Sequence, residues 1–330
     1  MKATKHPPAL VPPAVAKWQF VEEKARAVLD SYCHREVRPP LLEPLAGLDA
    51  TAAFVQAYVT HMPWQTDPVT RWYSMGAAFR AETGPFGWQQ GHEIAAALFG
   101  LPGPSAEAEL YGMAGTLLRE CGLPASHLRV TLFANDRESP DHQQMVFDLL
   151  TQLGHHPHRA PARAGHDPDP GITLQITLNR VASPAPAPLL LCRGRRHDQV
   201  IAHMGGPDTP AVAWSIDLGQ IVAALDDADQ GYQAPVALLL APLSPAARQR
   251  ILPLAQRLRA IGIRTEVEHR EIDAEGALAL ERASKLGARL VVLVPDAPGD
   301  DVVTLIDLAS GQRRPIGADD LEVRVAQLLD

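Results

Sequence analysis

Charged side chains within otherwise apolar segments are the residues of this chain most suited to chemistry. Arg80 ends the first of two predicted strands in residues 71–100, beside Phe79 and several alanines. An arginine that leaves an apolar strand can bind an anion with its planar guanidinium group. The alternative is an edge-strand arginine that pairs with Glu82. On its sequence context alone, Glu93 in the second predicted strand is a carboxylate paired across the sheet.

Histidines and cysteines give little sign of a metal site. Four histidines lie in residues 154–169, a polar segment rich in proline and glycine, for which we predict a solvated loop. No acidic or cysteine residue stands at ligand spacing from them. The cysteines have neither metal-ligand nor paired spacing, which is typical of reduced core residues in a cytosolic protein. We therefore expect no metal site; the residues concerned are His155, His156, His158, His166, Cys33, Cys121 and Cys192.

Hydrophobic periodicity predicts the elements that would position the charged residues. From Lys17 to Tyr32, apolar side chains fall on one helical face. Residues 171–181 alternate apolar and polar side chains and residues 187–192 are continuously apolar, which favours a hairpin of an antiparallel sheet. Further helices are predicted at 107–121 and 141–153 and around 54–59, and further strands at 127–134 and 209–218.

The composition is that of an ordinary globular protein with about two domains. Of its 330 residues, 46% are hydrophobic and 21% are charged, so a substantial core can form. The net charge of -8 disfavours broad electrostatic attraction to nucleic acid. No segment has the apolar length of a signal peptide or a membrane span, and we therefore expect a cytoplasmic protein.

The composition changes after the predicted antiparallel sheet. Residues 226–234 have the composition of a linker between a core of residues 1–225 and a second domain of residues 235–330. Strands and helices alternate in the second domain, which implies a mostly parallel sheet covered by helices. The predicted fold class is α+β, an antiparallel sheet with helices followed by a small α/β domain. The second domain is predicted to hold strands at 236–240, 264–268, 290–294 and 302–307, and helices at 246–261, 274–286 and 320–329.

Four segments, in the same order, resemble those of histidyl-tRNA synthetases, which are class II aminoacyl-tRNA synthetases. Residues 37–45 (VRPPLLEPL) resemble motif 1, and residues 71–100 resemble motif 2. Residues 192–218 are similar to the family's Gly-Gly-Arg-Tyr-Asp-Gly-Leu segment and the motif 3 that follows it, here near 209–221. Residues 235–329 resemble the anticodon-binding domain. The resemblance implies a class II synthetase-like core, an anticodon-binding-like domain and a homodimer that pairs through residues 37–45.

The resemblance also implies a ligand pocket. Arg80 stands where the family arginine grips the ATP α-phosphate, and Asp49 where an acidic residue holds the substrate ammonium group. Glu93 replaces a glutamine that touches the amino acid. Without the resemblance, Asp49 is equally well explained as a helix N-terminal acid that complements the helix dipole. The implied pocket comprises Asp49, Thr51, Arg80, Glu82, Glu93, Arg196 and Asp198, of which Asp49, Thr51, Arg80, Glu93 and Arg196 are expected to line one cleft.

Departures from the family pattern argue against catalysis. Gln220 replaces the motif 3 arginine that binds ATP, and Asp217 brings a carboxylate to a glycine position, where it would repel a triphosphate. Arg195 replaces a motif glycine and would crowd the substrate pocket. The family's Arg-Gly-Leu-Asp-Tyr-Tyr segment has no counterpart before Gly171, and the basic loop after motif 2 has become Gly-Trp-Gln at 87–89. We therefore expect no catalytic residue, no aminoacylation and no bound cofactor.

Two classes of non-catalytic function fit these departures, and a reduced but active ligase is a third reading. Residues 215–218 and the Asp49 segment look like the regulatory subunit of short-form ATP phosphoribosyltransferase, which implies the catalytic subunit of that enzyme as a partner. That subunit generally lacks a complete second domain, so an RNA-binding pseudo-synthetase is the alternative. One helix of the second domain carries arginines that could form a basic face for RNA, and the alternative is an ordinary solvated face. No aromatic residues for base stacking are interleaved with these arginines. The arginines concerned are Arg248, Arg250, Arg257, Arg259 and Arg264.

Overall fold

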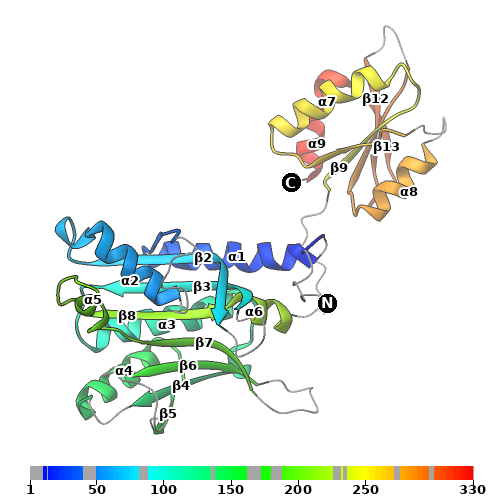
Figure 1. Cartoon of the computed structure of the whole chain (residues 1–330). Helices are drawn as coiled ribbons and strands as arrows, with labels where there is room; N and C mark the ends of the chain where they lie inside the picture. The colour runs from blue at the N-terminus through cyan, green and yellow to red at the C-terminus, as the bar shows by residue number, and fades with distance from the viewer. Residues whose placement is uncertain are drawn as a thin grey trace, which may run out of the picture. The chain divides into compact units, whose positions relative to one another are not determined.

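The computed structural model divides into two compact units, Met1–Tyr232 and Gln233–Asp330, each with its own hydrophobic core (Figure 1). It describes residues 10–12, 14–39, 50–81, 88–134, 138–161, 172–179, 188–225, 232, 236–270, 276–296 and 301–329. No helix in these ranges is long and apolar enough to cross a membrane.

The first unit is built on one large sheet. Its strands follow the order β1-β2-β3-β8-β7-β6-β4-β5. The β1–β2 and β4–β5 pairs are parallel and the other pairs are antiparallel. The strands are β1 (Arg35–Glu36), β2 (Thr70–Ala81), β3 (Trp88–Phe99), β4 (Leu128–Ala134), β5 (His158–Pro161), β6 (Thr173–Leu178), β7 (Leu189–Arg196) and β8 (Ala211–Asp217).

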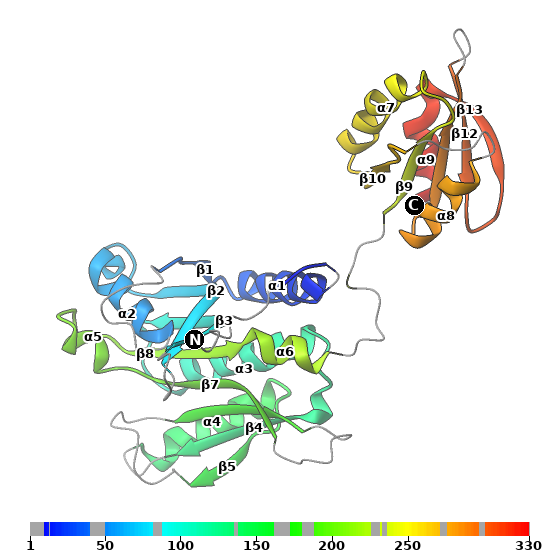
Figure 2. The same ribbon diagram turned by 45° about the vertical axis from the view of Figure 1, so that its right-hand side comes forward.

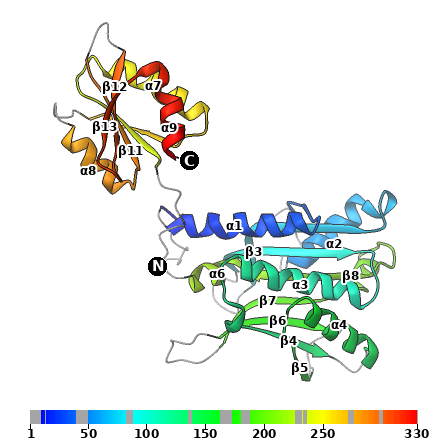
Figure 3. The ribbon, with the colours of Figure 1, turned by 180° about the vertical axis from the view of Figure 1, so that it is seen from behind.

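Helices pack on both faces of this sheet. The back face is covered by α1 (Ala14–Ser31), α3 (Pro104–Glu120), α4 (Pro140–Gln152) and α6 (Leu218–Ala224), as Figure 3 shows from that side. The front face carries α2 (Ala50–His61) and the short α5 (Val200–His203). Short 3-10 turns lie at Pro63–Gln65 and Ala125–His127.

The continuous apolar run of β3 from Ile94 to Phe99 explains how the sheet is buried on two sides. Ile94, Ala96 and Leu98 face the back core, whereas Ala95, Ala97 and Phe99 face α2. Successive side chains of a strand point to opposite faces, so neighbouring residues belong to different cores. The alanines on the front allow α2 to lie close to the strands.

The second unit has a sheet of order β10-β9-β11-β12-β13, with β10 and β13 at its two edges (Figure 2). The helices α7 and α9 pack on one face and α8 on the other. The elements are β9 (Leu238–Pro242), α7 (Arg248–Ala260), β10 (Thr265–Val267), α8 (Ala277–Lys285), β11 (Leu290–Val294), β12 (Val302–Asp307), β13 (Arg313–Gly317), a 3-10 turn (Ala318–Asp320) and α9 (Leu321–Leu329).

The structure confirms the predicted α+β class and corrects three details. The expectation of a mostly parallel second sheet is wrong, because β12 pairs antiparallel with both β11 and β13. The connections at residues 295–301 and 308–312 are too short for the crossover of about a dozen residues or more that parallel neighbours need. The strand β13 was not predicted at all.

The third correction concerns residues 154–169, which were predicted to be a solvated loop. Within them, residues 158–161 form β5, which pairs with β4, and His155 is buried beside Gly112 and Gly115 of α3. Residues 162–169, with His166, lie outside the described residues. Burial lowers the pKa of His155. The prediction failed because sheet pairing and packing against glycines override local composition.

Candidate functional site

Two carboxylates stand side by side on the front face of the first sheet. Glu93 of β3 lies in register with Asp217 of β8 on one side and with Gly76 of β2 on the other. Glu93 is 7% exposed and Asp217 is half-buried. Strand alternation places both on the same face as Ala95 and Ala213, which pack under α2. Like charges at directly opposed positions cost stability, which favours a cation or a donor group nearby.

Two glycines, Gly76 and Gly91, lie beside Glu93 on the front face. A Cβ built at Gly76 or at Gly91 meets no atom within 4 Å in the described part of the chain. Both glycines share the face of Glu93, since Gly76 pairs with it and Gly91 precedes it by two residues. Among the described residues, no side chain therefore covers the backbone of these two glycines beside Glu93.

Basic and polar side chains continue this face one strand further. Arg193 of β7 pairs with Ser215, and Arg195 pairs with Ala213. Gln175 of β6 pairs with Arg193 from the other side. The face thus carries acids on β3 and β8 and arginines on β7, an arrangement suited to a small ligand with both a cationic and an anionic group.

Several predicted pocket residues cannot be placed. Asp49 and Glu82 lie outside the described residues. Thr51 belongs to α2 and Arg80 to β2, where the Arg80 backbone is in register with Gln89, but the structure describes no more of these two than their backbone. Their roles in ligand binding remain predictions.

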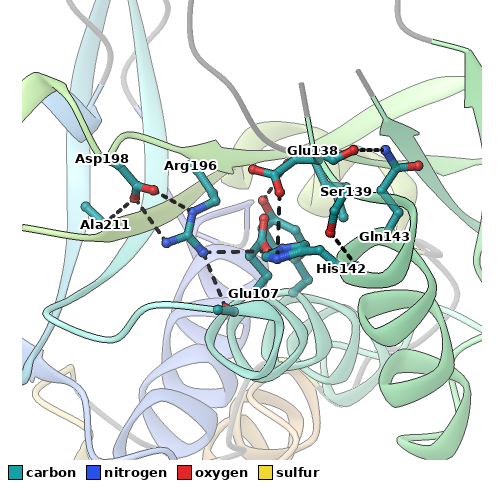
Figure 4. A network of polar contacts seen from close by, with 11 residues as sticks. Glu107, Glu138, Ser139, His142, Gln143, Arg196, Asp198 and Ala211 are labelled. Atoms are coloured by element: carbon teal, nitrogen blue, oxygen red, sulfur yellow. Dashed lines mark hydrogen bonds and ion pairs between the residues drawn. The ribbon is translucent and has the colours of Figure 1, made fainter. Parts of the chain in front are cut away.

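Arg196 and Asp198 lie together, but on the other side of the sheet. Arg196 is 4% exposed and donates from Nε and Nη2 to Asp198 at 3.0 and 3.1 Å (Figure 4). Asp198 also accepts the backbone N–H of Ala211 at 2.8 Å. Arg196 Nη1 donates to the carbonyl of Gly103, just before α3, at 3.4 Å. This pair ties the end of β7 to the start of α3.

The pair is part of a larger buried network that the sequence did not reveal. Glu107 of α3 is fully buried, and its Oε2 lies 3.6 Å from Arg196 Nη1. The same carboxylate forms a hydrogen bond with His142 Nε2 of α4, and that bond raises the pKa of His142. Glu107 and His142 are 35 residues apart, and nothing in their local sequence links them. Glu107 was predicted only as part of a helix.

The expectation that Glu93 and Arg196 line one cleft is therefore wrong. Arg196 pairs in register with Val212 of the back core, whereas Glu93 shares the front face with Ala95. The two side chains lie on opposite faces of the sheet. The physical reason is strand parity: Cys192, Gly194 and Arg196 alternate toward α3, and Gly194 leaves room there for Tyr111.

Asp217 and Gln220, the two departures at the motif 3-like segment, have a local structural role. Asp217 is the N-cap of α6, and its Oδ1 accepts the backbone N–H of Gln220 at 3.2 Å. An N-cap carboxylate satisfies an otherwise unpaired helix N–H and complements the helix dipole. The carboxylate is thus held at the edge of the front face, next to Glu93.

The arginines of the second unit are largely engaged within the unit. Arg250 pairs with Asp301 and donates to the carbonyl of Pro295 at 3.2 Å. Arg257 pairs with Glu322, and Arg259 donates to the carbonyl of Thr265 at 2.9 Å. These bonds favour the reading of a solvated, internally paired helix face over a free phosphate-binding surface.

A groove of about 330 Å³ lies on the second unit between α8 and the segment after β10. Its charged side chains are paired with one another, because Glu268 contacts Arg270 and Arg282, and Glu281 contacts Lys285. The contacts with Arg270 and Arg282 lower the pKa of Glu268 to about 2, and the hydrogen bond with Arg270 is the largest cause. Within the described residues, no group of three or more His, Cys, Asp or Glu side chains could hold a metal ion.

Comparison with known proteins gives a consistent picture. No family model matches the chain. It is 25% identical to the histidine--tRNA ligase of Cyanothece sp., over 94% of this chain and 93% of that protein. Apo histidyl-tRNA synthetase from S. aureus superposes with a TM-score of 0.83 at 19% identity, covering 98% of this chain and 99% of that one.

A second solved structure extends the comparison. It is described as an ATP phosphoribosyltransferase regulatory subunit/histidyl-tRNA synthetase from Bacillus halodurans, and it matches with a TM-score of 0.68 at 12% identity. The match covers 90% of this chain and 99% of that chain. Similar folds therefore occur both in synthetases and in a protein described as a regulatory subunit.

Proposed function

Because the chain is histidyl-tRNA synthetase-like in sequence and fold, we propose that it is a non-catalytic paralogue that acts as a regulatory or partner-binding subunit. The partner we propose is the catalytic subunit of a short-form ATP phosphoribosyltransferase in histidine biosynthesis. The protein acts in the cytoplasm as a homodimer. The observation that carries the proposal is the Asp217 carboxylate, which caps α6 where the family has the motif 3 glycine and lies in register with Glu93.

An ATP site needs positive charge around the triphosphate, whereas the motif 3-like segment supplies negative charge. Side chains in directly opposed register positions have Cβ atoms about 4.5–5.5 Å apart. Glu93 and Asp217 therefore set two carboxylates beside the region where the family binds ATP. Gln220 replaces the arginine, and its backbone N–H is bonded to Asp217. Repulsion between these carboxylates and a phosphate chain supports a protein that does not activate an amino acid.

The fold match to the Bacillus halodurans protein supports a regulatory role. One observation favours the second candidate, an RNA-binding pseudo-synthetase: Gln233–Asp330 forms a complete second unit with its own sheet and core. The internal bonds of Arg250, Arg257 and Arg259 count against a phosphate-binding surface on that unit. The first candidate is therefore preferred.

The purified protein is expected to show no histidine-dependent exchange of pyrophosphate into ATP. The reason is the carboxylate pair and the missing arginine at the motif 3-like segment. A matched double variant, Asp217→Asn with Gln220→Arg, keeps an oxygen acceptor at the N-cap but removes the net negative charge that Glu93 and Asp217 give the site. Calorimetry should show tighter ATP binding by this variant than by the wild type. Robust exchange by the wild-type protein would contradict the proposal and support the reduced ligase.

Co-expression with the short-form ATP phosphoribosyltransferase of the same genome is expected to give a stable complex. Size-exclusion chromatography with light scattering should show a homodimer alone and a larger assembly with the catalytic subunit. Nuclease treatment should not change that assembly. Failure to form the assembly, together with nuclease-sensitive RNA in the purified protein, would instead support the RNA-binding candidate.

A further inference from the structure

The buried network on the back face is not used by the proposed function. Its central group is Glu107, whose side chain is fully enclosed and whose Oε1 has no hydrogen-bond partner in the described chain. A carboxylate in such a position is costly unless cations lie close to it. Arg196 already shares its charge with Asp198 and approaches Glu107 only to 3.6 Å. His142 is the other group that can supply positive charge.

His142 lies between two carboxylates from different segments. Its Nε2 is bonded to Glu107 of α3, and its Nδ1 lies 3.7 Å from Glu138 Oε2, just before α4 (Figure 4). The side chains of His142 and Glu138 are 16% and 19% exposed. A neutral imidazole carries one N–H, whereas an imidazolium carries two. Both carboxylates can therefore receive a proton donor only when His142 is charged.

The start of α4 depends on the same residues. Ser139 is the N-cap and accepts the backbone N–H of His142 at 3.2 Å, and Gln143 donates to the carbonyl of Glu138 at 3.0 Å. His142 stands in the first turn of α4, where the helix dipole disfavours a positive charge. The carboxylates of Glu107 and Glu138 must outweigh that effect for the imidazolium to persist.

We propose that His142 is a proton-operated latch that fastens the start of α4 to α3. In the charged state it bridges Glu107 and Glu138. In the neutral state the remaining N–H stays with Glu107, since a fully buried carboxylate loses more than a partly buried one, and Glu138 is released. The groups that face His142 are Glu107 from α3, Arg196 with its partner Asp198 from β7, and Glu138 from its own segment.

The sign of the pH effect follows from the raised pKa of His142. Its main cause is the hydrogen bond to Glu107, with burial acting in the opposite direction. A histidine whose pKa is raised by folding adds stability that is complete below its ordinary pKa. That stability is lost as the pH rises through the folded pKa. The latch is therefore closed below the ordinary pKa of histidine and opens as the pH rises through the raised pKa of His142.

Hydrogen exchange of the full-length protein, read by mass spectrometry at pH 5.5 and 8.5 and corrected for intrinsic rates, tests the latch. Peptides from Glu138 to Gln152 are expected to lose about three- to tenfold protection at the higher pH. Peptides of α1 serve as the internal reference and should not change. In His142→Gln the pH dependence of the α4 peptides should disappear, and in Glu138→Gln it should be reduced, because the Glu107 bond to His142 remains in that variant.

Two results would overturn the latch. One is equal protection of the wild-type α4 peptides at both pH values, and the other is an undiminished pH effect in Glu138→Gln. The second variant matters because Glu138 is only partly buried, so its replacement leaves the core intact even where His142→Gln fails to fold. A titration of the His142 ring by NMR, assigned from the His142→Gln spectrum, should give a pKa above the ordinary value. A pKa at or below that value contradicts the proposal.

Discussion

Replacement of Arg196 with alanine is expected to destabilise the first unit by about 3–5 kcal/mol, the usual cost of breaking a buried ion pair from one side. The arginine is 4% exposed and lies between Asp198 and the fully buried Glu107. Its removal leaves the Glu107 carboxylate with His142 as its one bonded partner in the described chain. A buried charge without compensation costs more than the original pair contributed.

Tryptophan fluorescence during urea unfolding measures this effect in the first unit alone. Trp18, Trp64, Trp72, Trp88 and Trp214 are the 5 tryptophans of the chain, and all precede the second unit. The control is Arg38→Ala, because Arg38 pairs with Glu36 but its side chain is 84% exposed. Exposed pairs contribute little, so the control should unfold like the wild type. Equal midpoints for the two variants would show that the network is not a stabilising one.

The regular elements could be predicted from the sequence because their periodicity reflects burial directly. Val21, Ala25, Val28 and Leu29 form the buried face of α1 at the positions that the 3.6-residue period indicates. The strand β11 begins and ends where its apolar run does. Such local patterns are set by the core that each element faces. They can therefore be read from the sequence even when the element that packs against them is not known.

The face of Arg196 could have been deduced, but only with a longer strand. The predicted strand stopped at Cys192, whereas β7 continues to Arg196. The run after Cys192 is polar and lacks apolar residues, so the sequence did not indicate that the strand continues. Alternation from Cys192 through Gly194 then directs Arg196 to the back face, away from Glu93.

The long-range contacts could not be deduced. Glu107 and His142 belong to two helices that look amphipathic and ordinary, and their meeting depends on how α3 and α4 pack. Likewise, the sequence showed that Asp217 and Gln220 depart from the family pattern. It could not show that Asp217 caps α6 while lying in register with Glu93. Register between strands distant in sequence is decided by the whole sheet.

Gly100→Ala is expected to be among the most destabilising single substitutions in the first unit, with a loss that exceeds about 4 kcal/mol. Gly100 ends β3 with a φ of +87°, and a Cβ at this position would lie 1.7 Å from the carbonyl oxygen of Pro68. The obstacle is backbone, which cannot swing aside as a side chain can. A shift of Gly100 itself would disturb the hydrogen bond from its backbone N–H to the carbonyl of Pro210, which is 2.8 Å long.

Gly122→Ala separates the steric clash from the backbone strain. Gly122 has a φ of +93°, but among the described residues a Cβ there would meet only Leu225 Cδ2, at the ordinary contact distance of 3.8 Å. That variant should lose only the cost of a left-handed alanine, about 1–2 kcal/mol. Both losses can be read from the tryptophan unfolding curves, and the difference between them measures the clash with Pro68. Equal losses would mean that the turn before β2 shifts freely, which would contradict a close and rigid contact between this turn and the end of β3.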